Sequence, residues 1–266
     1  MSNTSVRWSD LRTRALSALV MVAVGATGVW LGGPIFTGLV LILTAAMLWE
    51  LARMTAPTTG RMPLAIAAIA AVSLGICLSS PREIGGAVLL LPTLALALTP
   101  RRDRKLAAVI SAVIMVAGYG LILLRDEAGV SAILWVVAVV VVSDVLGYFV
   151  GRTVGGPKFW PTISPKKTWS GTVAGWVGAV GVGAVFMALD HANWTILLLS
   201  PFIAFAGQMG DIGESWIKRR SGVKDSSALI PGHGGVLDRF DAMVGAVAAL
   251  MLLDLLLTLS LPLAAG

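Results

Sequence analysis

The residues best suited to chemistry gather between positions 211 and 241, which hold five acidic and five basic residues. Asp211, Asp238 and Asp241 supply carboxylate oxygens there, and the stretch contains no cysteine and a single histidine. Such hard oxygen ligands favour Mg²⁺ over zinc, and protein-bound Mg²⁺ commonly contacts one or two carboxylates together with substrate phosphates. The stretch therefore predicts a divalent-cation site that acts on phosphate groups.

Basic side chains and a glycine-rich turn in the same stretch predict phosphate binding. Lysine and arginine neutralise phosphate charge, and the turn Pro231-Gly-His-Gly-Gly235 exposes backbone N–H groups that suit anions. The candidate phosphate-binding side chains are Lys218, Arg219, Lys224, His233 and Arg239. One helical stripe holds Asp211, Glu214, Ser215 and Lys218. Together these residues predict phosphoryl or nucleotidyl transfer, which needs positioning and charge neutralisation more than a protein nucleophile.

The rest of the chain is too apolar for a water-soluble protein. Of its 266 residues, 57% are hydrophobic and 13% are charged, whereas soluble proteins carry roughly 25% charged residues. This composition excludes a soluble enzyme, a disordered chain and a disulfide-stapled secreted module. The single cysteine, Cys77, forms no internal disulfide. We therefore expect an all-α polytopic integral membrane protein.

Apolar runs bounded by charges, proline or glycine predict about nine transmembrane helices, since each needs about 20 apolar residues. The predicted spans are 15–33, 34–50, 63–80, 85–100, 106–124, 130–150, 171–189, 194–214 and 242–262. We expect one membrane domain over 1–266. Its N-terminal scaffold helices, its catalytic helices and their two long cytoplasmic loops are expected at 1–125, 130–262, 151–170 and 215–241.

The basic residues predict how this domain is oriented. All of the 20 lysines and arginines except Arg82 and Arg125 fall on one side of the map, and that side faces the cytoplasm by the positive-inside rule. We therefore expect a cytoplasmic N-terminus, an external C-terminus and an active site that faces the cytoplasm. The expected location is a bacterial inner membrane. Topology also explains the net charge of +6, so no nucleic-acid partner is expected.

A second polar group surrounds Asp144, near the cytoplasmic end of span 130–150. An ionisable residue in a membrane helix is costly, so it normally pairs, lines a cavity or binds an ion. Asp144, Gly147, Tyr148 and Gly151 share one helix face. The glycines allow another backbone to approach that face. An ion pair that serves packing alone also fits Asp144.

The run from Ser215 to Asp241 resembles the signature of the phosphatidate cytidylyltransferases, also called CDP-diacylglycerol synthases. The matching positions are Ser215, Ile217, Lys218, Arg219, Lys224, Asp225, Ser227, Ile230, Pro231, His233, Gly234, Gly235, Val236, Asp238, Arg239, Phe240 and Asp241. Stretches 143–152, 164–168 and 210–215 are also similar, so the resemblance covers about 140–245. Ser170 departs from the pattern, because the family often has an acid there.

The resemblance implies that phosphatidic acid attacks the α-phosphorus of CTP, forming CDP-diacylglycerol and releasing pyrophosphate, with Mg²⁺ required. It also implies contact with membrane lipids and a homodimer, and it leaves a second, monovalent cation open. Asp211 and Asp238 are the first candidates for metal ligands, and Asp144 and Asp241 are further ligands or supporting acids. The implied phosphate-binding residues are Lys218, Arg219, Lys224, His233, Arg239, Lys167, Arg152, Ser215, Gly234 and Gly235.

Two other functions fit parts of the pattern. A related membrane transferase, such as a polyprenol kinase-like protein, would use a nucleotide on an isoprenoid acceptor. An ion-coupled transporter would carry buried acids near the bilayer midplane in both halves of the chain, whereas most acids here cluster in one half and near one face. The exceptions, Glu50 and Asp254, are interpreted as structural residues.

Overall fold

The computed structural model describes residues 3–56 and 60–257, and these residues are helical apart from loops and one short hairpin. Seven helices are long and apolar enough to cross a bilayer. They are α1 (Asn3–Leu31), α2 (Gly33–Thr55), α3 (Met62–Ser79), α6 (Arg104–Thr153), α7 (Trp169–Ala188), α8 (Ile196–Ser221) and α9 (Leu237–Leu257). The predicted all-α class and the polytopic membrane character are confirmed.

Two regions differ from simple one-span helices. The predicted span 85–100 forms two short helices, α4 (Arg82–Leu89) and α5 (Leu91–Leu98), with Pro92 in the first turn of α5. The predicted spans 106–124 and 130–150 both lie in α6, which is interrupted at Gly129 by a backbone φ of 76°. Glycine adopts positive φ without steric cost. The number of nine crossings stays a prediction, and the end of span 242–262 lies outside the described residues.

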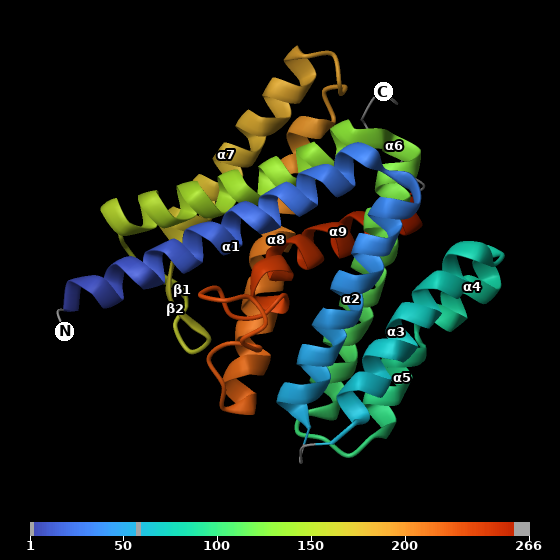
Figure 1. The fold of residues 1–266 in the computed structure, drawn as a ribbon. Helices are drawn as coiled ribbons and strands as arrows, with labels where there is room; N and C mark the ends of the chain where they lie inside the picture. The colour runs from blue at the N-terminus through green and yellow to red at the C-terminus, as the bar shows by residue number, and fades with distance from the viewer. Residues whose placement is uncertain (1–2, 57–59, 258–266) are drawn as a thin grey trace.

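Helix α6 is the central element of the fold, because it packs against α2, α5, α7, α8 and α9. Figure 1 shows α6 in green, with α1 crossing beside it and α3, α4 and α5 grouped at one side. Its buried side chains include Ile114, Trp135 and Val139. The glycine face predicted on this helix packs closely on α7, since a Cβ added to Gly171 would overlap the backbone of Gly147. Helices α7, α8 and α9 therefore all pack against one central helix.

Polar segments connect the helices at one end of the bundle. An antiparallel hairpin of β1 (Lys158–Trp160) and β2 (Ser164–Thr168) joins α6 to α7. A longer loop, residues 222–236, joins α8 to α9 and contains the glycine-rich turn; we call it the motif loop. Both segments lie near α8 in Figure 1.

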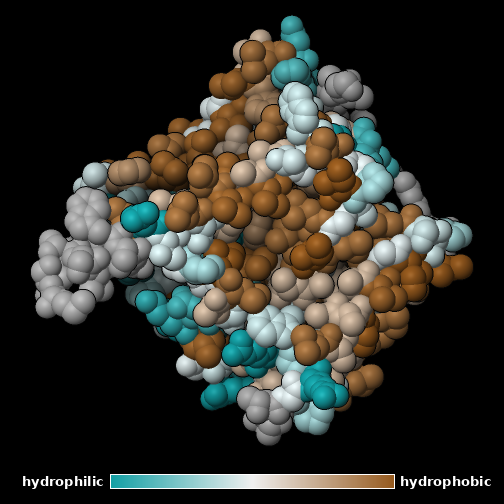
Figure 2. All heavy atoms as spheres, viewed as in Figure 1, coloured by the Kyte–Doolittle hydropathy of each residue, from teal (hydrophilic) through white to brown (hydrophobic). Residues whose placement is uncertain are grey.

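The outer surface of the bundle is apolar. Only 6% of the apolar stretch of helix α1 is buried, and side chains such as Leu19, Val22 and Trp30 are exposed. Figure 2 shows hydrophobic residues over most of the visible face, with hydrophilic residues gathered along its lower edge. An exposed apolar surface of this extent is typical of proteins that contact lipid.

Candidate active site

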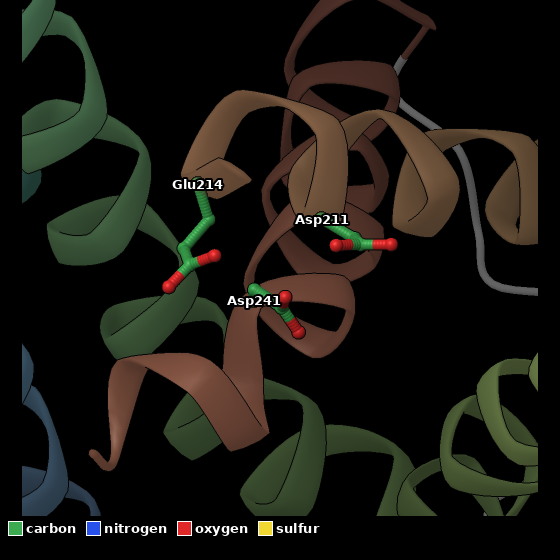
Figure 3. A group of neighbouring side chains, drawn as sticks. All are labelled: Asp211, Glu214 and Asp241. Atoms are coloured by element: carbon green, nitrogen blue, oxygen red, sulfur yellow. The ribbon is translucent and has the colours of Figure 1, made fainter. Parts of the chain in front are cut away.

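Three carboxylates from two helices meet at the centre of the candidate site. Asp211 and Glu214 lie three residues apart on α8, and therefore on one face of it, while Asp241 comes from α9. One oxygen of each residue lies within 4.8 Å of the other two. Figure 3 shows the three side chains converging from the two helices. We call Asp211, Glu214 and Asp241 the acid cluster.

Close packing of α8 on α9 allows the acid cluster to form. A Cβ added to Gly210 would overlap the carbonyl oxygen of Asp241, and one added to Gly245 would lie 2.5 Å from the carbonyl oxygen of Ala206. Neither position has room for a side chain. The two glycines therefore bring the backbones together at the height where Asp211 and Asp241 face each other.

Each carboxylate of the acid cluster has few partners among the described residues: Asp211 pairs with Lys167, and Asp241 accepts from the backbone N–H of Ala242 at 2.7 Å. Glu214 is 3% exposed, and no backbone N–H or hydroxyl group of the described residues donates to its oxygens. Its nearest cation is the Nζ of Lys218, 2.5 Å from Oε2. Three carboxylates at this spacing repel one another and are costly to bury. Hard oxygen donors with free lone pairs fit a divalent cation such as Mg²⁺.

Asp238, a first candidate for a metal ligand from the sequence, lies outside the acid cluster. Its Oδ1 accepts a 2.6 Å hydrogen bond from the Nζ of Lys218. Its Oδ2 accepts bonds from the backbone N–H of Ser226 (2.9 Å), the hydroxyl of Ser226 (2.8 Å) and the N–H of Gly235 (2.8 Å). Lys218 and the motif loop thus supply donors to both oxygens of this carboxylate. Glu214 shares the stripe of Asp211 but is not among the ligand candidates from the sequence.

A cavity of about 760 Å³ lies next to Asp211, between α6, α7, α8 and the hairpin. Four basic residues line it, and so do Asp144 and Asp211. The basic lining residues are Arg152, Lys158, Lys166 and Lys167. Lys167 forms an ion pair with Asp211 and also donates to the carbonyl oxygen of Gln208 at 3.3 Å. The two polar groups found in the sequence therefore meet at Asp211.

The floor of this cavity contains Gln208, which sequence reasoning missed. Its amide donates to the hydroxyl of Ser143 at 3.1 Å and to the carbonyl of Thr172 at 3.3 Å. Its oxygen accepts from the indole of Trp176 at 3.1 Å. Because these partners lie on α6 and α7, Gln208 joins three helices below the cavity. The sequence signal that could have identified it is a polar glutamine in an apolar run, about one helical turn before Asp211.

The remaining site candidates lie on the motif loop and around it. The Ser215 hydroxyl lies 3.4 Å from Oδ1 of Asp211. His233 is half-buried in the turn, and its Nδ1 has no hydrogen-bond partner among the described residues. Lys224 and Arg239 are exposed. Gly234 adopts a φ of 85°, and Gly235 is buried.

Arg219 points to a different hollow from the other candidates. It lines a second cavity of about 420 Å³ with Trp160 and Trp216, on the hairpin side of α8. Ser170, where the resemblance leads us to expect an acid, donates to the carbonyl of Gly155 and also contacts the Thr168 hydroxyl at 3.0 Å. Ser170 therefore closes the base of the hairpin.

Comparison with known proteins adds independent information. Residues 12–257 match the cytidylyltransferase family. A phosphatidate cytidylyltransferase of Brucella abortus biovar 1 is 35% identical over 259 residues, which cover 92% of this chain and 93% of that protein. One from Staphylococcus saprophyticus is 42% identical over 123 residues, or 45% of this chain and 47% of that protein. The match therefore includes the N-terminal helices as well as the site.

Proposed function

This chain belongs to the cytidylyltransferase family, and we propose that it transfers the cytidylyl group of CTP to phosphatidic acid. A phosphate oxygen of the lipid forms a bond to the α-phosphorus of CTP, the bond to the β-phosphate oxygen breaks, and pyrophosphate leaves. The product is CDP-diacylglycerol, a precursor for phospholipid synthesis. The match over residues 12–257 to this family carries the proposal, and the basic cavity beside three carboxylates supports it.

We propose that Asp211, Glu214 and Asp241 bind Mg²⁺. The bound ion would neutralise charge on the phosphates of the substrates. Lys218 lies between Glu214 and Asp238, at 2.5 Å and 2.6 Å, and so holds the edge of the acid cluster against the motif loop. Asp238 acts through Lys218 in this proposal, and Asp144 serves as a further acid on the cavity wall. A second, monovalent cation stays open.

The basic cavity is the proposed binding site for the CTP triphosphate. Arg152, Lys158, Lys166 and Lys167 supply positive charge, and Lys167 is already oriented by Asp211 and by the carbonyl of Gln208. Ser215, His233 and the turn glycines are proposed to contact phosphate from the motif-loop side. No protein nucleophile is required, because the lipid phosphate is itself an anionic nucleophile.

We further propose that the site opens to the cytoplasm of a bacterial inner membrane. Exposed Lys224, Arg219 and Arg239 then lie at the inner-leaflet surface, where basic residues attract anionic lipid. CTP would enter from solution and phosphatidic acid laterally from the membrane. Nine crossings, the single catalytic domain and a homodimer are parts of the same proposal.

The direct test uses protein purified in detergent, labelled CTP, Mg²⁺ and either phosphatidic acid or a polyprenol phosphate. We expect a lipid-soluble cytidine product with phosphatidic acid alone. Absence of that product would contradict the proposed reaction. Labelling of the polyprenol instead would keep cytidylyl transfer and replace the acceptor.

A further inference from the structure

A buried glutamate in the N-terminal half of the chain contacts the motif loop. Glu50 lies on α2 and is 0% exposed. Its Oε1 accepts hydrogen bonds from the hydroxyl of Ser227 (2.5 Å) and the backbone N–H of Val236 (2.9 Å). Its Oε2 accepts from the hydroxyl of Ser226 (3.2 Å) and the N–H of Leu237 (2.7 Å). All four donors belong to the segment 226–237.

Two of these hydrogen bonds lie where α9 begins. The first N–H groups of a helix have no partner within it, and a carboxylate placed there also interacts favourably with the helix dipole. Glu50 binds the N–H groups of Val236 and Leu237, where α9 starts. A residue next to the helix usually supplies such a cap. Here the cap comes from α2, and the first turns of α9 carry Asp238 and Asp241.

The same glutamate is connected to the acid cluster through the motif loop. The hydroxyl of Ser226 contacts both Glu50 and Asp238. Asp238 accepts a hydrogen bond from Lys218, which forms an ion pair with Glu214. A Cβ added to Gly235 would overlap Glu50 and Ser226. The motif loop therefore packs directly against Glu50, and position 235 has no space for a side chain.

We propose that Glu50 is a positioning residue for the active site. It fixes the motif loop and the start of α9, and thereby sets the distance of Asp241 from Asp211 and Glu214. This inference rests on the proposed function, because the acid cluster matters only if it binds the ion and substrates. The chemistry of the role is electrostatic. A buried carboxylate can only accept, and Glu50 faces two backbone N–H groups, the Ser227 hydroxyl and the Ser226 hydroxyl, whose single proton is shared with Asp238.

The test compares Glu50→Gln with Leu74→Ala, a matched change in the buried core. Leu74 packs near Gly118, away from the residues that bind Glu50. Glutamine keeps the size of Glu50 but places an NH₂ group against N–H and hydroxyl donors. Loss of a supporting residue typically costs about 10- to 100-fold in activity or metal affinity. We expect that loss in kcat, with a higher Mg²⁺ concentration for half-activation, in Glu50→Gln alone.

A second measurement, limited trypsin cleavage of the motif loop, does not depend on enzyme activity. Trypsin should cleave after exposed Lys224 several times faster in Glu50→Gln than in the wild type or Leu74→Ala, because the motif loop has lost its anchor. Ser227→Ala removes one donor to Glu50 and should cause a smaller change in the same direction, which keeps the test available if Glu50→Gln does not fold.

The outcomes are distinguishable. Suppose that the wild type shows no cytidylyltransferase activity but Glu50→Gln is cleaved faster than the wild type. That result would support Glu50 as an anchor of the motif loop and contradict the proposed function. Wild-type cleavage, kcat and Mg²⁺ dependence in Glu50→Gln, or in Ser227→Ala if only that variant folds, would overturn the inference. A loss of thermal stability equal to that of Leu74→Ala, without those changes, would also overturn it.

Discussion

Two acids beside Lys218 have opposite surroundings. Lys218 contacts both acids, but Asp238 also accepts hydrogen bonds from three loop donors, whereas no backbone N–H or hydroxyl group of the described residues donates to Glu214. A saturated carboxylate has no lone pair in a suitable direction for a cation, and an unsaturated one does. At the scale of the residue, we therefore expect the hydrogen-bond partners, and not the residue type, to decide which of the two acids binds a cation.

Asp241→Asn should weaken Mg²⁺ binding strongly. Changing residues that only support a metal ligand typically costs 10- to 100-fold, so loss of a ligand should cost at least about 100-fold in activity at fixed Mg²⁺. The measurement is product formation over a Mg²⁺ titration. Asp254→Asn on the same helix is the control, since Asp254 is not part of the acid cluster. Equal effects of the two changes would contradict the ligand assignment.

Asp238→Asn should act differently from Asp241→Asn. The amide would turn a donor toward Lys218 or the N–H groups of Ser226 and Gly235, so the motif loop should loosen. We expect faster trypsin cleavage after Lys224 in Asp238→Asn and wild-type cleavage in Asp241→Asn. Resistance of the loop in Asp238→Asn, together with a large shift in Mg²⁺ dependence, would instead return Asp238 to the ligand set.

At the scale of the element, the contact between α8 and α9 controls the site. Gly210 and Gly245 let the two backbones approach, and the carboxylates they bring together have no cation among the described residues except Lys218 and Lys167. Glycine within a helix lowers helix propensity by about 1 kcal/mol relative to alanine. A larger residue at either position would avoid this loss of helix propensity but would push the two helices, and with them the acids, apart.

Gly210→Ala should therefore destabilise the protein and reduce activity. The new Cβ would overlap the Asp241 carbonyl, and overpacking of this kind costs about 1–3 kcal/mol. Gly213→Ala is the control on the same helix, because a Cβ there has nothing within 4 Å. It should be neutral or stabilising by up to about 1 kcal/mol. Thermal denaturation and turnover of the two variants test this, and similar losses in both would contradict it.

Binding of Mg²⁺ between α8 and α9 should also stabilise the folded protein. A ligand that binds only the folded state stabilises it by about 2.7 kcal/mol at 100 times its Kd. We expect the thermal transition of purified protein to rise with Mg²⁺ and to fall with a chelator. The shift should disappear in Asp211→Asn. A full shift in that variant would place the ion elsewhere.

At the scale of the whole molecule, the polar loops and the apolar surface imply an orientation in the membrane. In a Cys77→Ala background, Ala228→Cys tests the motif loop and His191→Cys tests the short connection between α7 and α8. Both positions are exposed. We expect a membrane-impermeant maleimide to label Ala228→Cys from the cytoplasmic side and His191→Cys from the other. Labelling of both from one side would contradict the proposed topology.

The sequence by itself determined the class of protein, the helices and the chemistry. Hydropathy acts locally, so apolar runs predict helices wherever they lie, and the i, i+3 spacing places Asp211 and Glu214 on one face of α8. The basic loops, the glycine face at Gly147 and the family signature are likewise readable from neighbouring residues. The break at Gly129 is likewise local, because it falls between the predicted spans 106–124 and 130–150, just after the charged residues 125–127.

Only the tertiary structure decided which carboxylates stand together. Glu214 and Asp238 look alike in the sequence, yet one joins the acid cluster and the other is bound by the motif loop. Glu50 was interpreted as structural, and its loop partners lie 176 to 187 residues away in the chain. Partners at such separations depend on which helices pack together and at what height, and that is set by long-range packing rather than by local pattern.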